Sequence, residues 1–323
     1  MTRDQRHGLP EDPRILFMGT PEFAVPTLKA LIQKGYPIVA VVTQPDRPKG
    51  RGRKFAASPV KRLAADNNIL TLQPEKVSSR DFYDFIQEEA PDLIVVVAFG
   101  QKLSEDILAI PEYGVINIHA SLLPKYRGAA PIQRVILNNE SMTGLTVMRM
   151  DKGLDTGPIL YQEEVPILKD ETAGRLHDRM ASMAGDMIIR FMVKYNRNQI
   201  HERAQDHSIA TYAKKIGKEM SLIQWELDAD RISGLIRALD PRPGAYTIFG
   251  DKKIKLFTSR VLDGTRSDTV PGRIFVEKGE KFQVETGRGL IEIGELQYPG
   301  KKRLLSKDFL RGFSFPKGAV LGK

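Results

Sequence analysis

The chain has 323 residues, of which 41% are hydrophobic and 28% charged, as is typical of a globular protein long enough for two domains. It contains no cysteine, which excludes disulfides, thiol nucleophiles and thiolate metal sites, and its five histidines lack the spacing of metal ligands, so we expect no bound metal. The sequence has no apolar run long enough to cross a bilayer, and its polar first residues lack the hydrophobic centre of a signal peptide, so we expect a cytoplasmic protein without a membrane partner.

The formal net charge of +9 is concentrated in the last third of the chain. Residues 218–323 carry 20 Lys and Arg against 14 Asp and Glu, whereas residues 1–217 carry 29 against 26. A basic domain suits a polyanionic partner such as a nucleic acid, although many basic proteins make no specific contact with one. Charge alone therefore leaves a nucleic-acid partner open.

Apolar runs alternate with amphipathic stretches along the first half of the chain. A strand at 14–18, a helix at 21–34 and a strand at 38–43 make a β-α-β unit, which indicates a parallel sheet. Thr20 is the expected N-cap of this helix. The turn before the helix lacks the G-x-G-x-x-G of dinucleotide sites, which argues against NAD or FAD. The alternation continues with helices at 58–67, 79–89, 104–110 and 130–138, and with strands at 93–98, 114–120, 143–150 and 159–165.

A basic loop follows the second predicted strand. Residues 44–57 are rich in Pro and Gly and carry five positive charges between Arg47 and Lys54, against the single negative charge of Asp46. The loop lacks the G-K-[ST] of a nucleotide P-loop. A solvated flexible loop and an anion-binding loop both remain open, and the position of the loop at the carboxyl end of a strand favours the second.

Two polar side chains lie near the end of the predicted strand at 114–120, whose other residues are mostly apolar and β-branched. Since side chains two apart on a strand leave the same face, Asn117 and His119 should point the same way. In open α/β sheets the crevice beyond the carboxyl ends of the strands is where ligands bind, and this pair would lie there. The alternative is a half-buried histidine with a satisfied backbone bond, beside a turn-forming asparagine.

Two carboxylates in the Gly-rich loop at 150–158 could complete this pair. Asp151 more readily caps its own turn, which leaves Asp155 as the carboxylate for His119. An imidazole moves protons near neutral pH, an amide donates to developing negative charge, and a carboxylate orients the imidazole or supports its charge. With no serine–base pair evident and no cysteine, the set suits direct transfer of an acyl group to an amine through a tetrahedral oxyanion, although the chemistry does not demand that reaction.

The last third of the chain changes character. A long amphipathic helix at 172–194 is expected to cover the sheet, and a polar stretch from 195 to 217 follows it. We therefore predict a domain at 12–200, a linker at 201–217 and a C-terminal domain at 218–323 that begins with a helix at 229–239. Short alternating stretches separated by turns then predict a small β-barrel with little helix. These stretches lie at 245–249, 253–261, 272–276, 281–285 and 290–295.

Longer motifs around these residues resemble a known family. Asn117-Ile-His119, with the following Ala-Ser-Leu-Leu-Pro-Lys-Tyr-Arg-Gly-Ala-Ala-Pro131 and with Gly153-Leu-Asp155-Thr-Gly157, closely resembles the catalytic signature of the folate-dependent formyltransferases. Within that superfamily, the segments 17–23, 44–54 and 214–219 are similar to those of the methionyl-tRNA formyltransferases. The resemblance covers essentially the whole chain from about Arg14.

The resemblance implies a Rossmann-like, mostly parallel α/β catalytic domain and a C-terminal β-barrel similar to an OB fold that holds tRNA. It implies that Asn117, His119 and Asp155 are a catalytic trio. The implied reaction moves the formyl group of 10-formyltetrahydrofolate to the α-amino group of methionyl-initiator tRNA, for translation initiation. The implied folate contacts are Ala98, Phe99, Gly100, Ser121, Leu122, Leu123, Pro124, Asp151 and Gly153. The implied tRNA contacts are Arg47, Lys49, Arg51, Arg53 and Lys54, and Arg51 is the one most associated with the acceptor end.

Other functions stay open on the sequence alone. A formyltransferase acting on a nucleotide sugar or a small amine, or a formyltetrahydrofolate hydrolase, would share the trio without needing both the basic loop and the basic barrel. A non-enzymatic RNA-binding protein would need the barrel but not the trio. We expect a monomer, because the basic faces suit RNA better than self-association.

Overall fold

The structure is a computed structural model that describes residues 8–49, 54–262, 269–277 and 280–322. It divides into two compact units. The α/β unit comprises the described residues up to Gly128 together with Gly144–Val165 and His177–Tyr212, and the C-terminal unit comprises Ala129–Thr143, Pro166–Leu176 and the described residues from Ala213 onward. No helix within these ranges is both long and apolar enough to cross a membrane.

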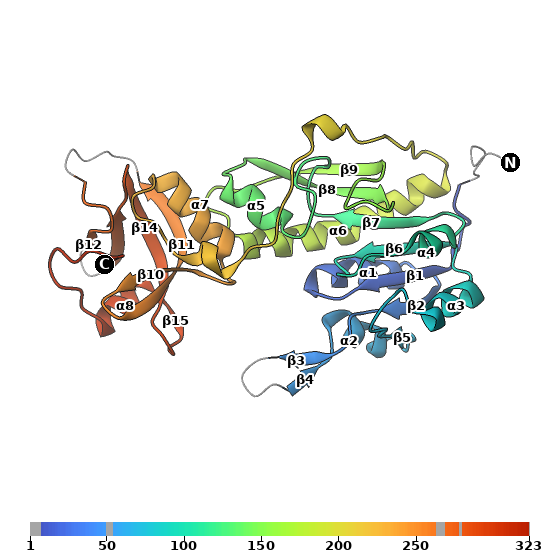
Figure 1. Cartoon of the computed structure of the whole chain (residues 1–323), viewed down its shortest axis with the longest axis horizontal. Helices are drawn as coiled ribbons and strands as arrows, with labels where there is room; N and C mark the ends of the chain where they lie inside the picture. The colour runs from blue at the N-terminus through green and yellow to red at the C-terminus, as the bar shows by residue number, and fades with distance from the viewer. Residues whose placement is uncertain (1–7, 50–53, 263–268, 278–279, 323) are drawn as a thin grey trace. The chain divides into compact units, whose positions relative to one another are not determined.

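A seven-stranded sheet forms the centre of the α/β unit, with strand order β5-β2-β1-β6-β7-β8-β9 (Figure 1). The pairs from β5 to β7 are parallel, and β8 runs antiparallel to β7. β6 is buried along its whole length, as its uniformly apolar sequence predicts for a central parallel strand. The strands are β1 (Ile15–Gly19), β2 (Ile38–Val42), β5 (Thr71–Leu72), β6 (Leu93–Val97), β7 (Val115–His119), β8 (Met142–Arg149) and β9 (Ile159–Pro166).

Helices between these strands follow the predicted positions closely. Ser58 and Ser104 cap two of them, each accepting a backbone N–H three residues on, as a serine before a helix predicts. Gly185 marks a close approach, because a Cβ there would lie 2.9 Å from the Pro26 carbonyl oxygen. The helices are α1 (Val25–Gln33), α2 (Pro59–Asp66), α3 (Arg80–Glu89), α4 (Glu105–Ala109) and α6 (Ala173–Asn196), with a 3₁₀ turn η2 at His207–Ile209.

The prediction that Thr20 caps the first helix is wrong. Residues Glu22–Ala24 form a 3₁₀ turn, η1, before α1 begins, and the N-cap residue is Pro21 for η1 and Ala24 for α1. The Thr20 hydroxyl instead accepts the Gln44 N–H at 3.1 Å and donates to the Phe99 carbonyl oxygen at 3.3 Å. Because these partners follow β2 and β6, Thr20 ties together the carboxyl ends of three strands.

The two described ends of the basic loop form strands that the sequence does not predict. Its arms pair as a small antiparallel hairpin of β3 (Arg47–Lys49) and β4 (Lys54–Ala56). We call residues 47–56 the basic hairpin. Two of its predicted tRNA contacts, Arg51 and Arg53, lie outside the described residues. The prediction missed these strands because three-residue strands in a Pro- and Gly-rich segment carry almost no periodicity.

An antiparallel sheet forms most of the C-terminal unit, with strand order β10-β11-β14-β13-β12 and β15 paired to β14. Its buried side includes Leu256, Phe282 and Ile293. Ile232 of α7 and Trp225, which precedes α7, belong to the same hydrophobic core. The predicted mostly parallel α/β fold followed by an antiparallel β domain is thus confirmed, although α8 and β15 were not predicted. The elements are α5 (Pro131–Leu137), η3 (Lys218–Ser221), α7 (Ala229–Leu239), β10 (Ala245–Phe249), β11 (Lys252–Leu262), β12 (Ile274–Glu277), β13 (Lys281–Glu285), β14 (Leu290–Gln297), β15 (Arg303–Leu305) and α8 (Ser306–Gly312).

Candidate active site

Strand β7 presents Asn117 and His119 from the interior of the sheet. Asn117 lies opposite Val96 of β6 and Met148 of β8, so the pair projects from a strand that is hydrogen-bonded on both sides. The His119 side chain is buried, whereas Asn117 is partly exposed and its amide forms no hydrogen bond with any described residue. A rigid strand therefore holds a buried imidazole next to an amide that is free to donate to a ligand.

Two groups lie against the His119 ring. Its Nε2 is 2.9 Å from the Tyr126 carbonyl oxygen, which can only accept, so Nε2 carries a proton. Its Nδ1 is 3.7 Å from Asp155 Oδ2, an ion-pair distance when the ring is charged. The structure thus brings the predicted histidine and carboxylate together, with Nδ1 as the nitrogen that can gain and lose a proton.

Asp155 itself and two other residues of the α/β unit, Tyr126 and Ala98, adopt the left-handed backbone conformation without being glycine. Ala98 has φ +48°, Tyr126 has φ +61° and Asp155 has φ +53°. Such conformations cost on the order of 1–3 kcal/mol each and persist where the surroundings enforce them, most often at functional sites. One enforcing contact is visible at Asp155, whose Oδ2 accepts the Gly128 N–H at 2.8 Å.

The turn after β6 exposes backbone at its rim. Ala98 and Gly100 are exposed, the latter with φ +93°, while Phe99 between them is buried. This arrangement leaves main-chain groups at the carboxyl edge of the sheet that a flat heterocycle could reach. It is compatible with the predicted folate contact but leaves that contact a prediction.

The predicted folate residues at 121–124 play two different structural parts. Ser121 and Leu123 are buried, and the Ser121 hydroxyl donates to the Lys125 carbonyl oxygen at 2.6 Å, so these side chains shape the loop. Leu122 and Pro124 are partly exposed and are the members that a ligand could touch. Thr146 of β8 fixes the loop, since its hydroxyl donates to the Ser121 carbonyl oxygen at 2.6 Å and accepts the Leu123 N–H at 3.2 Å.

Asp151 caps its own turn, as the sequence predicts. Its Oδ1 accepts the Gly153 N–H at 2.9 Å and the Thr156 hydroxyl at 2.7 Å. A Cβ at Gly153 would lie 1.9 Å from Thr156 Oγ1, so a larger residue there would displace the hydroxyl that donates to Asp151. The turn therefore presents Asp155 toward His119, while Asp151 holds the turn in shape.

A polar cluster anchors the start of the basic hairpin to the sheet. Lys61 Nζ of α2 lies 2.6 Å from Asp46 Oδ2 and 2.5 Å from Gln73 Oε1. Gln73 Nε2 in turn donates to Asp46 Oδ1 at 2.9 Å and to the Gln44 carbonyl oxygen at 2.8 Å. The hydrogen bond from Lys61, and to a smaller extent the one from Gln73, holds the pKa of Asp46 below its ordinary value. Beyond this anchor, Arg47 is exposed and Phe55 is 74% exposed.

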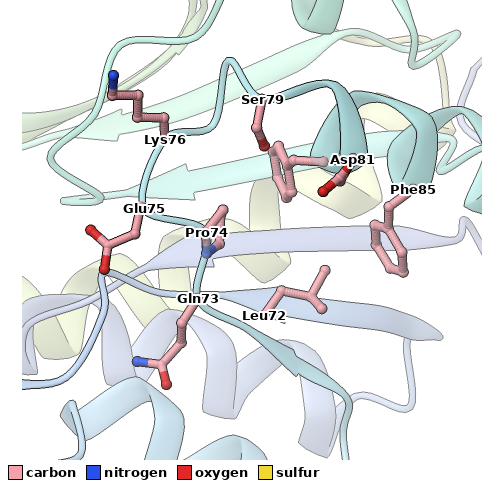
Figure 2. A pocket seen from close by; sticks show the side chains of 9 residues that line it. Leu72, Gln73, Pro74, Glu75, Lys76, Ser79, Asp81 and Phe85 are labelled. Atoms are coloured by element: carbon pink, nitrogen blue, oxygen red, sulfur yellow. The ribbon is translucent and has the colours of Figure 1, made fainter.

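A cavity of about 620 Å³ lies between the end of β5 and α3 and shares Gln73 with this polar cluster (Figure 2). Its floor is largely apolar, from Leu72, Phe82 and Phe85, and it contains no member of the predicted trio. We therefore place the chemistry at the end of β7, where titratable groups meet. The remaining lining residues are Gln73, Pro74, Glu75, Lys76, Ser79 and Asp81.

Several groups that contact the site were not predicted from the sequence. The Tyr126 carbonyl and the Gly128 N–H act through the backbone, which side-chain patterns do not reveal. Gln205, 50 residues beyond Asp155, donates to the Asp155 carbonyl oxygen at 2.9 Å, although it falls in the predicted linker. The Lys-Tyr-Arg-Gly motif at 125–128, which contains Tyr126 and Gly128, is a sequence signal that could have identified these two residues.

Two family profiles match the chain. One, described as "Formyl transferase", matches residues 13–192, and the other, "Formyl transferase, C-terminal domain", matches residues 215–314. Relatives similar to the chain over nearly its full length carry the name methionyl-tRNA formyltransferase. That of Syntrophus aciditrophicus is 44% identical over 95% of this chain and 98% of its own. Those of Citrifermentans bemidjiense and Geobacter sulfurreducens are each 46% identical over 96% of this chain, and over 96% and 97% of their own.

Solved structures share the fold at lower identity. A sugar 3N-formyl transferase, WlaRD, superimposes with a TM-score of 0.65 at 21% identity, over 91% of this chain and all of its own. The N-formyltransferase of Helicobacter canadensis gives 0.64 at 19% identity over 88% of this chain and 99% of its own. HypX from Aquifex aeolicus in complex with tetrahydrofolic acid gives 0.64 at 17% identity over 93% of this chain, which spans 47% of that protein.

Proposed function

Since this chain belongs to the formyl transferase family, we propose that it transfers the formyl group of 10-formyltetrahydrofolate to the α-amino group of methionyl-initiator tRNA, for translation initiation. The observation that carries the proposal is the match to methionyl-tRNA formyltransferases at 44–46% identity over both chains almost entirely. His119 lies against Asp155, and the amide of Asn117 is free to donate a hydrogen bond. These groups suit the reaction that the match implies.

In the proposed reaction, a bond forms between the methionyl amine and the formyl carbon, and the bond from that carbon to the folate nitrogen breaks. Asn117 donates a hydrogen bond to the oxyanion that develops on the formyl oxygen. His119, with Nε2 held by the Tyr126 carbonyl, relays through Nδ1 the proton that leaves the amine and ends on the folate nitrogen. Asp155 stabilises the charged imidazole across the 3.7 Å gap.

The formyl donor would supply an activated acyl group, and three backbone segments fit it. The exposed main chain of Ala98 and Gly100 suits a flat heterocycle, with Phe99 buried between them as support. Leu122 and Pro124 offer apolar contact at the rim, in the loop that Ser121 and Leu123 shape. The turn from Asp151 to Gly157, which includes Gly153, is the third segment proposed to contact the formyl donor.

We assign the basic hairpin to the acceptor end of the tRNA, through Arg47, Lys49, Arg51, Arg53 and Lys54. Exposed cations that gather phosphates release counterions and supply much of RNA affinity. We assign residues 12–200 to catalysis and residues 218–323, with their basic excess, to the tRNA body. The protein is proposed to act as a monomer in the cytoplasm.

One assay separates this function from its alternatives. The protein is incubated with 10-formyltetrahydrofolate and methionyl-tRNA, and acid-resistant formylmethionyl-tRNA is measured together with free formate. Parallel reactions replace the tRNA with an amino-sugar nucleotide, with a small amine or with buffer alone. The proposal expects formylmethionyl-tRNA to be the dominant product. Formate release independent of tRNA would identify a hydrolase, and preference for the sugar or small amine would identify another formyltransferase.

A further inference from the structure

Behind the predicted trio lies a buried arginine. Arg127 is only 1% exposed, which is unusual for a guanidinium, and its hydrogen bonds go to uncharged or titratable neighbours. Its Nε and Nη2 donate to Gln205 Oε1 at 3.1 and 2.7 Å, and its Nη1 lies 3.2 Å from His207 Nδ1. Within the described chain it forms no ion pair with a carboxylate. Burying a charge without an opposite charge is costly, so a positioning role would account for its presence.

Arg127 lies between two residues whose backbone groups contact the site. Its two neighbours each offer a backbone group to the site, since the Tyr126 carbonyl oxygen accepts from His119 and the Gly128 N–H donates to Asp155. Tyr126 also has a left-handed backbone, with φ +61°. Arg127 thus lies between the two residues whose hydrogen bonds orient the histidine and the carboxylate. The main chain here is also held by Thr211, whose hydroxyl accepts the Tyr126 N–H at 2.8 Å and whose carbonyl oxygen accepts the Arg127 N–H at 2.9 Å.

Gln205 connects Arg127 to the opposite side of the site. Its Oε1 accepts both guanidinium hydrogen bonds, while its Nε2 donates to the Asp155 and Gly157 carbonyl oxygens at 2.9 and 2.7 Å. The Gln205 side chain thus accepts hydrogen bonds from Arg127, next to the Tyr126 carbonyl that contacts His119. It donates hydrogen bonds to the turn that carries Asp155. Only an amide at this position satisfies both sides, because a carboxylate has no donor.

We infer that Arg127 and Gln205 are positioning residues that set the distance between His119 and Asp155 from opposite sides. The inference rests on the proposed formyl transfer for its effect on rate, but not for its effect on the geometry of His119. Small displacements of reacting groups cost up to ~100-fold in rate. Neither side chain touches the substrates, so their loss should lower turnover and leave tRNA binding intact.

The test compares Gln205→Glu with Gln205→Ala. Gln205→Glu keeps the acceptor for Arg127, and adds an opposite charge, but turns an oxygen toward the Asp155 and Gly157 carbonyls. If Gln205 positions the site, both variants should lose about 10- to 100-fold in kcat, with the KM for tRNA within about 2-fold of wild type. If Arg127 merely needs a partner to stay folded, Gln205→Glu should keep wild-type kcat, and that result would overturn the inference.

Gln87→Glu is the matched control, since Gln87 is an exposed amide on α3 that binds the Tyr83 hydroxyl. It introduces the same charge and should leave kcat unchanged. Thermal unfolding checks that the variants are folded, and Arg127→Lys, which keeps a buried cation but not both bonds to Gln205, provides a second route. We expect Arg127→Lys to lose kcat in the same proportion, and wild-type turnover in this variant would also contradict the inference.

Nuclear magnetic resonance of the His119 imidazole separates this inference from the proposed function. The Nε2 proton bound to the buried Tyr126 carbonyl should exchange slowly in the wild type and faster in the Gln205 variants, whatever the substrate. If the wild type fails to formylate methionyl-tRNA but the proton responds as expected, the function is wrong and the positioning is right. An unchanged proton in folded variants would refute the positioning.

Discussion

Two regions at the carboxyl edge of the same sheet are built in opposite ways. At the end of β7, both ring nitrogens of His119 have a defined neighbour: the Tyr126 carbonyl oxygen lies at one and the Asp155 carboxylate faces the other. At the basic hairpin, Asp46, Lys61 and Gln73 hold the start of the segment, and the described residues Arg47 and Phe55 beyond them are exposed.

The difference matches what each region is proposed to do. Stabilising developing charge requires groups that are already in place, because reorganisation during the reaction would cost rate. Gathering phosphates requires charge that is accessible to a large polyanion, and such contacts are individually weak and sensitive to salt. Substitutions at the end of β7 should therefore change turnover, and substitutions in the hairpin should change tRNA affinity.

The largest effect is expected for the trio. His119→Ala and Asn117→Ala should each lose about 10²- to 10³-fold in kcat, since each removes a group that acts on the developing oxyanion or its proton. Steady-state kinetics and tRNA binding measure the two quantities separately, and affinity should change little. Near-normal turnover in either variant would remove that residue from the site.

Asp155→Asn should have a smaller effect. The variant keeps an oxygen that can accept the Gly128 N–H but loses the negative charge opposite His119 Nδ1. We expect about a 10²-fold loss in kcat from weaker support of the charged imidazole. Rates measured at saturating concentrations of both substrates would show it, and a variant as fast as wild type would mean that the charge of Asp155 is not used.

Arg51→Ala should act on binding rather than on chemistry. Loss of one phosphate contact reduces the slope of log affinity against log salt by about 1 and weakens tRNA binding at every salt concentration. Arg80→Ala, at an exposed arginine on α3 that pairs with Asp84, is the control. Equal slopes for wild type and Arg51→Ala would exclude this arginine from the tRNA contact.

Lys61→Met tests the anchor of the hairpin. Removing the ammonium breaks the bonds to Asp46 and Gln73 and should loosen the start of the hairpin without touching its cations. We expect the KM for tRNA to rise by about 3- to 10-fold, equivalent to about 1 kcal/mol, with kcat unchanged. A loss of kcat with unchanged KM would show that the anchor supports the catalytic edge instead.

The smallest effect concerns stability and pH. Because the folded-state pKa of Asp46 lies below its ordinary value of 3.8, its contribution is complete above that value and disappears as the pH falls through the folded-state pKa. Asp46→Asn should therefore be less stable than wild type at pH 7 by less than about 1 kcal/mol, and the difference should shrink in acid. Denaturant unfolding at both pH values measures it, and a difference that grows in acid would contradict the assignment.

Sequence patterns located the elements more successfully than the contacts between them. The helix at 229–239 and the strands at 245–249 and 281–285 occur as predicted, because periodicity and caps are local signals. The predicted capping role of Thr20 is wrong because its hydroxyl bonds instead to Gln44 and Phe99, which follow β2 and β6 and are distant in sequence. The strand alternation and the Gly-rich turn selected Asn117, His119 and Asp155 as candidates. The long motifs implied their catalytic roles, which stay predictions.

The residues that hold the candidate site residues in position could not be predicted from the sequence. Gln205 lies in a polar stretch with no periodicity, and nothing local indicates that it bridges Arg127 and Asp155. The hydrogen bonds of Tyr126 and Gly128 are made by main-chain atoms, which any residue type possesses. The Gln205 contacts join segments 78 and 50 residues apart in the chain, and they become visible only when the fold places those segments together.

The most direct test of the division between chemistry and binding is the single-turnover formylation rate with both tRNA and 10-formyltetrahydrofolate saturating. At saturation, the Arg51→Ala protein should formylate methionyl-tRNA at the wild-type rate, because a binding defect is overcome by concentration. The His119→Ala protein should remain at least about 10²-fold slower, because its defect lies in the transition state. A persistent deficit in Arg51→Ala together with a recovered rate in His119→Ala would contradict the account.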